Sequence, residues 1–519
     1  MVFLLALAHA TDFYDCSLDS WTLSVGTPNP VALADIATTT WSSATPQESF
    51  GNGLAVAPDG ALLILAQGWG GGWTSDPVPG SLYAWDTVAP GSFDASSATA
   101  SVGLPDHPHD DLSVFPGNPP LALVPTRLAG ILGFELPLGS GAAPLLTLED
   151  PPQTDSASPR AADVDGDGVP DLCLGLERPA DIAVHLGPFT AGETRHPRFD
   201  ADLRFVVDEG PSSSVSTSVL PIGDIDGDGA DDLLATWSGY LPATPGTAPN
   251  ILPGAMFLWT GHTTPGTFPA SSATAVIEGS CRSLLSGEVR VVGHVGPDPT
   301  RTLIGTMGVS TTLGGFPERG ALFLMDLAGV SGTVGIADVS TAVIVGEEFA
   351  ELAYVLPLGD LDGDGYDDFA VAQHSPGVVF VFRGPVDGLR ETTTADLRIE
   401  NGGNTSIGQH MAVHDFDGDG VVDLVLGAPY DGLGGEVHFI PGAAILARLG
   451  VPLPPPAPEP PADTGVADDT GAQDTDPVDT GPADSDTDAS IVPITVRGGV
   501  GCSHAAPWAD VLAGFSRRR

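Results

Sequence analysis

One nine-residue motif constrains the fold of this chain more than any other feature of its sequence. It is clearest at residues 415–423, Asp-Phe-Asp-Gly-Asp-Gly-Val-Val-Asp, and an apolar run, 424–428, follows at once. The motif occurs four times, with aspartates at its first, third, fifth and ninth positions. These are Asp163, Asp165, Asp167 and Asp171; Asp224, Asp226, Asp228 and Asp232; Asp360, Asp362, Asp364 and Asp368; and Asp415, Asp417, Asp419 and Asp423.

This spacing of carboxylates suits a hard divalent cation. Ca2+ prefers a shell of about six to eight oxygen atoms from carboxylates, backbone carbonyls and water. A glycine at the sixth position of each copy allows the sharp turn that directs these oxygens inward. The seventh residue offers its backbone carbonyl, and this residue is Val169, Ala230, Tyr366 or Val421. We therefore predict about four Ca2+ ions, one in each loop.

The loop is not an EF-hand, because its twelfth position lacks the bidentate glutamate of that motif. Leu174, Ala235, Val371 and Leu426 stand there instead. The residues after each loop are short, apolar and partly β-branched, which indicates a buried strand and not a helix. A solvated acidic turn would explain a single copy, but it is a poor explanation for four copies in one register.

The spacing of the copies predicts further, degenerate copies. Neighbouring copies lie about 60 residues apart, except that Asp224 and Asp360 lie about twice as far apart. Residues 289–304 fill this gap, because they align without insertion on residues 219–234. His294 replaces the first carboxylate and only Asp298 is retained, so we expect this loop to keep its shape and not to bind metal.

Two more degenerate copies, 54–65 and 112–124, precede the first intact loop and replace it with a short Pro/Gly turn. A second apolar strand recurs in step with the seven copies, at residues 80–85, 130–134, 181–186, 254–259, 320–325, 377–382 and 435–440. Several strands per unit, without helical periodicity, indicate an all-β, seven-bladed β-propeller. The period is too long for WD40 repeats.

The repeats resemble the FG-GAP repeats of the integrin α-subunit head and its bacterial relatives. The last copy fits best, with Ile407-Gly408 at the Phe-Gly position and Gly427-Ala428-Pro429 at the Gly-Ala-Pro position. The first copy retains Phe50-Gly51. The resemblance covers residues 31–445 and implies a propeller with Ca2+ loops between strands of individual blades. Three of the seven loops depart from the family pattern.

The two ends of the chain differ in composition from the repeats. Residues 1–10 resemble the end of a secretory signal without its basic region, the alternative being an apolar first strand. We expect the propeller over residues 11–450. Residues 451–490 are rich in Pro and Asp-Thr-Gly, which predicts a disordered acidic linker that acts as a spacer, with weak calcium buffering as the alternative.

Residues 491–519 end in Gly501-Cys502, a semi-apolar stretch and three arginines. This order resembles a MYXO-CTERM-type sorting tail, which implies processing near Cys502 and surface attachment; a disordered terminus is the alternative. Cys173 follows the first intact loop and is expected to be a small buried residue. A Cys16–Cys281 disulfide is an open alternative that no spacing argument supports.

Charge excludes several classes of partner and chemistry. The formal net charge is −49, and all 18 basic residues are arginine. Nucleic acid and anionic membranes are therefore poor partners, and the lack of lysine excludes Schiff-base and P-loop chemistry. No run of about 18 apolar residues predicts a transmembrane helix.

Catalytic motifs are also lacking: we find no G-x-S-x-G, H-E-x-x-H or Cys/His zinc spacing. The cluster 107–111, which contains His107, is interpreted as a solvated turn, and His185, His414 and His438 as strand positions. We expect a secreted or cell-surface, monomeric, non-enzymatic module that binds an extracellular protein or glycan. The alternative is a hydrolase or lyase with its site at the mouth of the central channel.

Ligand contacts are expected on the face opposite the calcium loops. Long connections there carry Trp69, Trp73 and Tyr240, whose rings suit stacking against a polymer or glycan. Solvated turns with incidental aromatics are the alternative interpretation of these connections.

Overall fold

The structure is a computed structural model of the whole chain. It describes residues 22–45, 48–68, 79–108, 112–126, 129–149, 158–176, 181–206, 217–237, 254–261, 264–279, 284–309, 320–347, 352–373, 377–402, 407–432 and 434–453. The expected signal (1–10), nearly all of the linker and the sorting tail lie outside these residues, as do Cys16, Cys281, Trp69, Trp73 and Tyr240.

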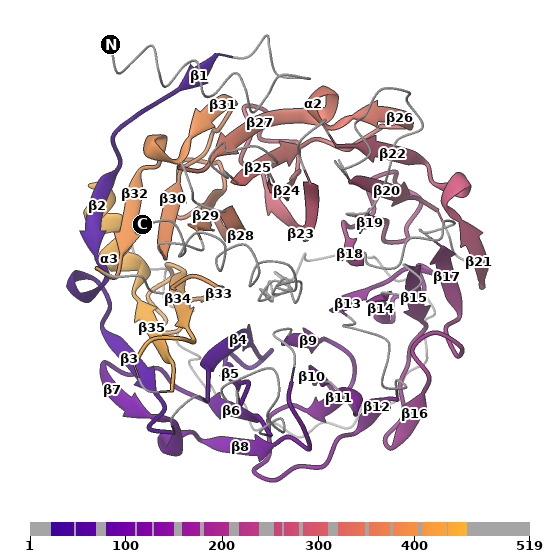
Figure 1. The fold of residues 1–519 in the computed structure, drawn as a ribbon, viewed down its shortest axis with the longest axis horizontal. Helices are drawn as coiled ribbons and strands as arrows, with labels where there is room; N and C mark the ends of the chain where they lie inside the picture. The colour runs from indigo at the N-terminus through magenta and orange to yellow at the C-terminus, as the bar shows by residue number, and fades with distance from the viewer. Residues whose placement is uncertain are drawn as a thin grey trace, which may run out of the picture.

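Seven sheets stand in a ring around a central axis, so the chain is the seven-bladed β-propeller that its repeats predict (Figure 1). Each innermost strand contacts the innermost strands of its two neighbours. These seven strands are β4 (Phe50–Val56), β9 (Ser113–Phe115), β13 (Ser158–Ala162), β18 (Thr217–Pro221), β23 (Leu284–Gly293), β28 (Leu352–Gly359) and β33 (His410–His414). Blades are numbered in this order, from blade 1 at β4 to blade 7 at β33.

Each blade continues outward through three further antiparallel strands. The second strands are β5 (Leu62–Ala66), β10 (Leu121–Thr126), β14 (Asp171–Leu176), β19 (Leu233–Trp237), β24 (Leu303–Val309), β29 (Asp368–Gln373) and β34 (Asp423–Ala428). The third strands are β6 (Ser81–Trp85), β11 (Gly130–Glu135), β15 (Asp181–His185), β20 (Ala255–Trp259), β25 (Gly320–Met325), β30 (Val378–Phe382) and β35 (Glu436–Ile440). The seven recurring apolar strands of the sequence are therefore all third strands.

The fourth strands are β8 (Ala100–Gly103), β12 (Leu146–Leu148), β17 (Leu203–Val206), β22 (Ala275–Glu278), β27 (Ser340–Val345), β32 (Leu397–Glu400) and β3 (Thr39–Ser42). The last of these closes the ring. β3 comes from the N-terminal part of the chain and pairs antiparallel with β35 of blade 7, with Trp41 opposite Val437. Blade 7 thus joins three late strands to one early strand.

A fifth, parallel strand borders most blades and was not predicted. It comes from the segment that precedes the fourth strand of the following blade, as when β7 of blade 1 lies on β3 of blade 7. These strands are β16 (Glu193–Arg195), β21 (Gly266–Pro269), β26 (Gly332–Gly335), β31 (Gly388–Glu391), β2 (Asn29–Ala32) and β7 (Gly91–Asp94). β1 (Leu23–Ser24) adds a sixth strand outside β31. Each border strand covers an edge that would otherwise be open.

Short helices complete the described chain. Single turns precede several fourth strands: η1 (Leu33–Asp35), η2 (Ala95–Ser97), η3 (Ala270–Ser272), α2 (Ile336–Val339) and η4 (Thr392–Thr394). The helix α3 (Gly442–Leu449) follows β35 and buries Ile445 and Leu446 against blades 6 and 7. Gly450, at a φ of 73°, caps its end.

The core consists of seven separate clusters, one between each pair of neighbouring blades. β5 shows why the strands are continuous apolar runs. Leu62 and Ile64 pack toward blade 7, whereas Leu63 and Leu65 pack toward blade 2. Because both faces of the sheet are buried, successive residues are all apolar instead of alternating with polar ones.

The Phe-Gly and Gly-Ala-Pro positions interlock neighbouring blades. At Gly51, with a φ of +89°, a Cβ atom would lie 2.8 Å from Val437 Cγ2 in blade 7. At Gly427 a Cβ atom would lie 2.4 Å from the carbonyl oxygen of Gly51. The two glycines therefore let the backbones of blades 1 and 7 approach more closely than a side chain would permit.

A substitution at Trp41 tests how much the packing of β3 between blades 7 and 1 contributes to stability. The Trp41 side chain is 1% exposed and packs beside Trp85 and Phe93, with ring centroids 6.1 and 6.5 Å away. Replacing it with alanine leaves a cavity between blades 7 and 1, so we expect Trp41→Ala to lower the free energy of unfolding by about 3–5 kcal/mol in urea titrations. Phe199→Ala, at a ring that is 77% exposed, is the control and should change it by less than about 0.5 kcal/mol. Equal effects would contradict this account of closure.

Candidate metal centres

All four acidic loops join the first and second strands of a blade, so they open at the same end of the ring. They lie in blade 3 (163–171), blade 4 (224–232), blade 6 (360–368) and blade 7 (415–423). Each follows the innermost strand, and its ninth residue begins or directly precedes the second strand. The loops therefore sit near the axis, each held by two buried strands.

The first aspartate organises the turn of each loop. In blade 7, Asp415 Oδ1 accepts the backbone N–H groups of Gly418 at 2.8 Å and Asp419 at 3.1 Å, while Oδ2 accepts that of Gly420 at 3.0 Å. The other loops repeat the bonds to the fifth and sixth residues. Because the carboxylate gathers these N–H groups, the backbone wraps around it and leaves the remaining lone pairs facing the centre of the loop.

Three carboxylates converge in every loop. Ligand oxygens of the first, third and ninth aspartates lie within 4.8 Å of one another in each set. The sets are Asp163, Asp165 and Asp171; Asp224, Asp226 and Asp232; Asp360, Asp362 and Asp368; and Asp415, Asp417 and Asp423. The sequence spacing predicted four aspartates in each set, and three members of each set converge here.

The fifth aspartate is placed differently. Its Oδ1 accepts the N–H of the seventh residue, as in the 2.8 Å bond from Val421 to Asp419, and it is not in the converging set. Asp167, Asp228 and Asp364 make the same bond. The second oxygen of the fifth carboxylate and the carbonyl of the seventh residue stay predictions as ligands.

The ninth carboxylate is the most buried member of each set. Asp423 and Asp368 are fully buried, and each accepts two backbone N–H groups, such as those of Phe416 and Gly442 at 2.8 Å for Asp423. Burial, followed by the charges of neighbouring aspartates, raises the pKa of both carboxyls to about 7. The same causes raise the pKa of Asp171 and Asp232 to about 6.

These raised pKa values express a cost of placing like charges together in a poorly solvated site. A divalent cation would remove that cost, because it compensates two charges and binds the converging oxygens directly. Oxygen-only donors select a hard ion such as Ca2+ over softer transition metals. The residues present therefore fit the cation that the sequence predicts, with the first, third and ninth aspartates of each loop as its side-chain ligands.

The degenerate loop of blade 5 also joins the first and second strands of its blade. β23 and β24 pair antiparallel as β18 and β19 do, but with register shifts that β18 and β19 lack. Arg301 Nε donates to Asp326 Oδ2 at 2.8 Å, and Asp298 accepts the N–H and hydroxyl of Thr300. The retained Asp298 is thus bonded within its own turn, and Arg301 at the eighth position pairs with a residue outside the loop.

Contacts between neighbouring loops were missed by the sequence analysis. Asp231 Oδ2 accepts the N–H of Asp163 at 2.8 Å, and its own N–H donates to the Asp163 carbonyl at 2.7 Å. Asp367 makes the same reciprocal pair with His294. Both aspartates occupy the eighth position, next to the ligand at the ninth, so the doublets Asp231-Asp232 and Asp367-Asp368 were the available signal.

The remaining candidates fall where the sequence placed them. His185, His414 and His438 lie on strands β15, β33 and β35. Cys173 is fully buried in β14, as predicted. His107 Nδ1 lies 2.9 Å from the Gln67 carbonyl oxygen, while residues 109–111 of its cluster lie outside the described residues. In the described part of the chain, no helix is long and apolar enough to span a membrane.

The carboxyl pKa values predict how pH affects stability. A carboxyl whose pKa is higher in the folded than in the unfolded state contributes stability at low pH that is lost as pH rises through its folded pKa. Burial lowers the pKa of His185 and that of His438, the latter to about 4, which acts in the opposite direction. Four raised carboxyls outweigh two histidines, so stability should fall between about pH 4, where unfolded aspartates titrate, and about pH 7, the highest folded pKa, in the metal-free protein.

Differential scanning calorimetry in chelator tests this. We expect the unfolding midpoint to fall over that range, and excess Ca2+ to abolish the decline because the cation favours ionised carboxylates. Asp423→Asn should flatten the pH dependence in chelator. A midpoint that rises with pH in the chelated wild-type protein would contradict the prediction.

Comparisons with known proteins find a similar repeat in part of this chain. Residues 360–426 match the family model of the FG-GAP-like repeat. Integrin alpha-PS3 of Drosophila melanogaster is 36% identical over 80 residues, which cover 14% of this chain and 7% of the integrin. The matched part is thus far shorter than the integrin itself.

Two solved structures match this chain with low sequence identity and low TM-scores. The WD40 domain of Toxoplasma gondii coronin is 10% identical, with a TM-score of 0.38, over 82% of this chain and 84% of that chain. Drosophila Plexin A, in a complex with Semaphorin 1b, is 10% identical, with a TM-score of 0.34, over 64% and 85%. The propeller therefore carries a repeat similar to the FG-GAP-like family, and part of its chain is similar to an integrin α-subunit.

Proposed function

We propose that this protein is a secreted or cell-surface, calcium-binding propeller that acts as an adhesion or recognition module. The observation that carries the proposal is the convergence of three carboxylates in each of four loops at one end of the ring. The FG-GAP-like repeat and the similarity to an integrin α-subunit support the same function. The partner we propose is an extracellular protein or glycan, bound by a monomeric propeller without catalysis.

In this proposal, bound Ca2+ stabilises the propeller. Each loop connects the innermost strand to the second strand of its blade, so an ion there fixes the spacing of two strands beside the axis. Extracellular Ca2+ modules often have dissociation constants of about 10⁻⁴–10⁻³ M, and at ten times that constant each site adds about 1.4 kcal/mol. Four sites would together supply a large share of the stability of an ordinary domain.

Calorimetric titration of the chelator-treated protein tests the number of sites. We expect about four equivalents of Ca2+ to bind, and Asp417→Ala to remove about one of them, because it deletes the third-position ligand of the blade 7 loop. Asp298→Ala, in the degenerate loop of blade 5, is the matched control and should leave the stoichiometry unchanged. A stoichiometry near zero, together with an unfolding midpoint that chelator does not alter, would eliminate calcium binding.

Recognition is proposed for the opposite end of the ring. The connections between second and third strands lie there, and their ends are held by buried strands, which leaves the loops free to vary in sequence. Trp69, Trp73 and Tyr240 belong to such connections but lie outside the described residues. Among the described residues, Tyr430 follows β34 at this end and its side chain is 52% exposed.

Replacing the aromatic residues tests this face. Trp69→Ala with Trp73→Ala, and separately Tyr430→Ala, should weaken attachment to the native cell surface or matrix by about tenfold, since stacked aromatics dominate many binding sites. The unfolding midpoint should change little. Phe199→Ala is the control, because Phe199 is also an exposed aromatic but lies between β16 and β17 and not in a connection between second and third strands.

Two results would count against recognition. Equal attachment of the wild-type and aromatic variants would exclude this face. Turnover of glycosidic, ester or phosphoester substrates, abolished by substitution of a single acid or histidine, would replace the binding proposal with an enzymatic one.

A further inference from the structure

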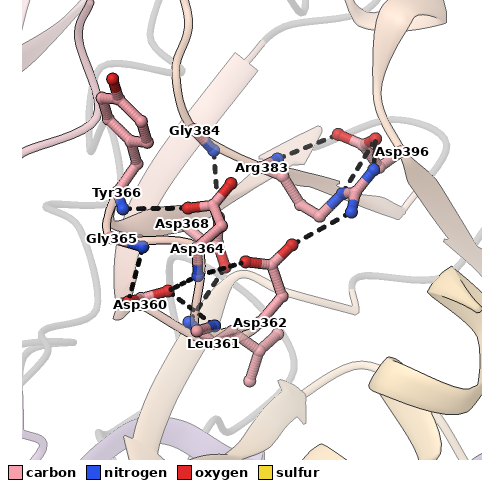
Figure 2. A network of polar contacts seen from close by, with 11 residues as sticks. Asp360, Leu361, Asp362, Asp364, Gly365, Tyr366, Asp368, Arg383, Gly384 and Asp396 are labelled. Carbon is pink, nitrogen blue, oxygen red and sulfur yellow. Dashed lines mark hydrogen bonds and ion pairs between the residues drawn. The ribbon is translucent and has the colours of Figure 1, made fainter. Parts of the chain in front are cut away.

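One of the four acidic loops carries a positive charge of the protein itself. In blade 6, Arg383 Nη1 donates to Asp362 Oδ2 at 3.0 Å, and Asp362 is the third-position carboxylate of the converging set (Figure 2). The Asp362 side chain is only 5% exposed, so this ion pair is shielded from solvent on the side of the carboxylate. The guanidinium therefore occupies one oxygen of a predicted cation ligand.

Arg383 is anchored so that it stays beside Asp362. Its Nε and Nη2 both lie 3.3 Å from Asp396 Oδ1, and its backbone N–H donates to Asp396 Oδ2 at 2.9 Å (Figure 2). Asp396 thus holds the arginine at both the main chain and the side chain. The Arg383 side chain is 36% exposed, but its charged end bridges two carboxylates and is not free to move into solvent without breaking both contacts.

The other intact loops have no arginine at the equivalent place. Arg383 directly follows the third strand of its blade, and the residues that follow the third strands of blades 3, 4 and 7 are Leu186, Thr260 and Pro441. The backbone contact is retained without the arginine: Leu186 N–H donates to Asp202 at 2.9 Å. The chain therefore supplies natural replacements for Arg383 that preserve the local fold.

In blade 5 the residue at the position of Arg383 is acidic, and its partner in the loop is basic. Asp326 follows the third strand there and pairs with Arg301 of the degenerate loop at 2.8 Å. In that blade an ion pair takes the place of the acidic cluster. In blade 6, by contrast, the arginine is added to a complete cluster, so protein charge and metal charge would share the same carboxylate.

We propose that Arg383 weakens cation binding in the blade 6 loop, so that this loop is the last of the four to fill as the Ca2+ concentration rises. The inference rests on the proposed calcium function. Arg383 neutralises Asp362 before a cation arrives, and its positive charge repels the cation once both are present. Three loops then hold the scaffold at low calcium, while the fourth responds to higher concentrations.

Tyr366 provides a reporter of this loop alone. It occupies the seventh position, where the other intact loops carry Val169, Ala230 and Val421. Terbium, a luminescent substitute for Ca2+, is sensitised by a nearby phenol ring, so the Tyr366-dependent signal reports the blade 6 loop. Displacement of terbium by Ca2+ in the full-length protein then gives the affinity of this loop, and Tyr366→Phe identifies the signal that belongs to it.

The decisive comparison is between wild type and Arg383→Thr, which copies the residue of blade 4. We expect Arg383→Thr to raise the Ca2+ affinity of the Tyr366 site about tenfold or more, the usual scale for one charge beside a carboxylate. Arg383→Lys retains the charge and should stay close to wild type. A loosened fold would instead make both variants weaker, which separates electrostatic competition from a structural effect.

The outcomes are distinct. Unchanged or weaker affinity in Arg383→Thr overturns the competition, and so does a wild-type blade 6 loop that fills before the others in calorimetry. An absence of Ca2+ and terbium binding in the wild-type protein overturns the proposed calcium function itself. Tighter binding at the Tyr366 site, with the three remaining sites unaltered, supports the inference.

Discussion

Burial of both faces of each blade is the constraint on which this structure depends. A sheet whose two faces are apolar needs an apolar neighbour on each side, and in a row of such sheets the first and last would each expose one face to water. Closing the row into a ring removes both exposed faces at once. The seven interblade clusters are the result, and the contact between blades 7 and 1, which includes Trp41 and Phe50, is of the same kind as the other six.

The crowding that this closure imposes is visible at the glycines. Gly51 and Gly427 meet across the boundary between blades 7 and 1, and Gly408, with a φ of +79°, lies against Val379 and Ala372 across the preceding boundary. At that position a Cβ atom would lie 2.6 Å from Val379 Cγ2. The small residues that give the repeat its signature are therefore explained by packing between blades, whereas the acidic residues lie at the opposite ends of the second strands and are free to serve a ligand.

Much of the fold could be predicted because each sequence repeat contains the same pattern of strands and turns. The ninth aspartate marks the start of a second strand, and the gapless alignment of His294 on Asp224 located a blade that had lost three of its four carboxylates. Three of the four aspartates that the spacing grouped in each loop converge, whereas the fifth-position aspartate bonds to the backbone of the seventh residue instead. Contacts between different repeats could not be predicted from the spacing of the motifs. Parallel border strands such as β16 pair across a blade boundary, and the bond from Asp163 to Asp231 joins the loops of two neighbouring blades. The bond from Arg383 to Asp362 lies within blade 6, but it joins the acidic loop to a residue that follows the third strand.

The pairing of β3 with β35 has a consequence for how the molecule is made. The two strands are separated by almost the whole propeller, so their hydrogen bonds close a loop with a large entropic cost that grows only slowly with its length. During synthesis, β3 leaves the ribosome long before its partner exists. Six blades can be complete while Trp41 still has no blade 7 to pack against, and the finished core between blades 7 and 1 forms only after β35 has emerged. In this order of synthesis the blades emerge from blade 1 onward, and the ring closes on a segment that emerged before blade 1.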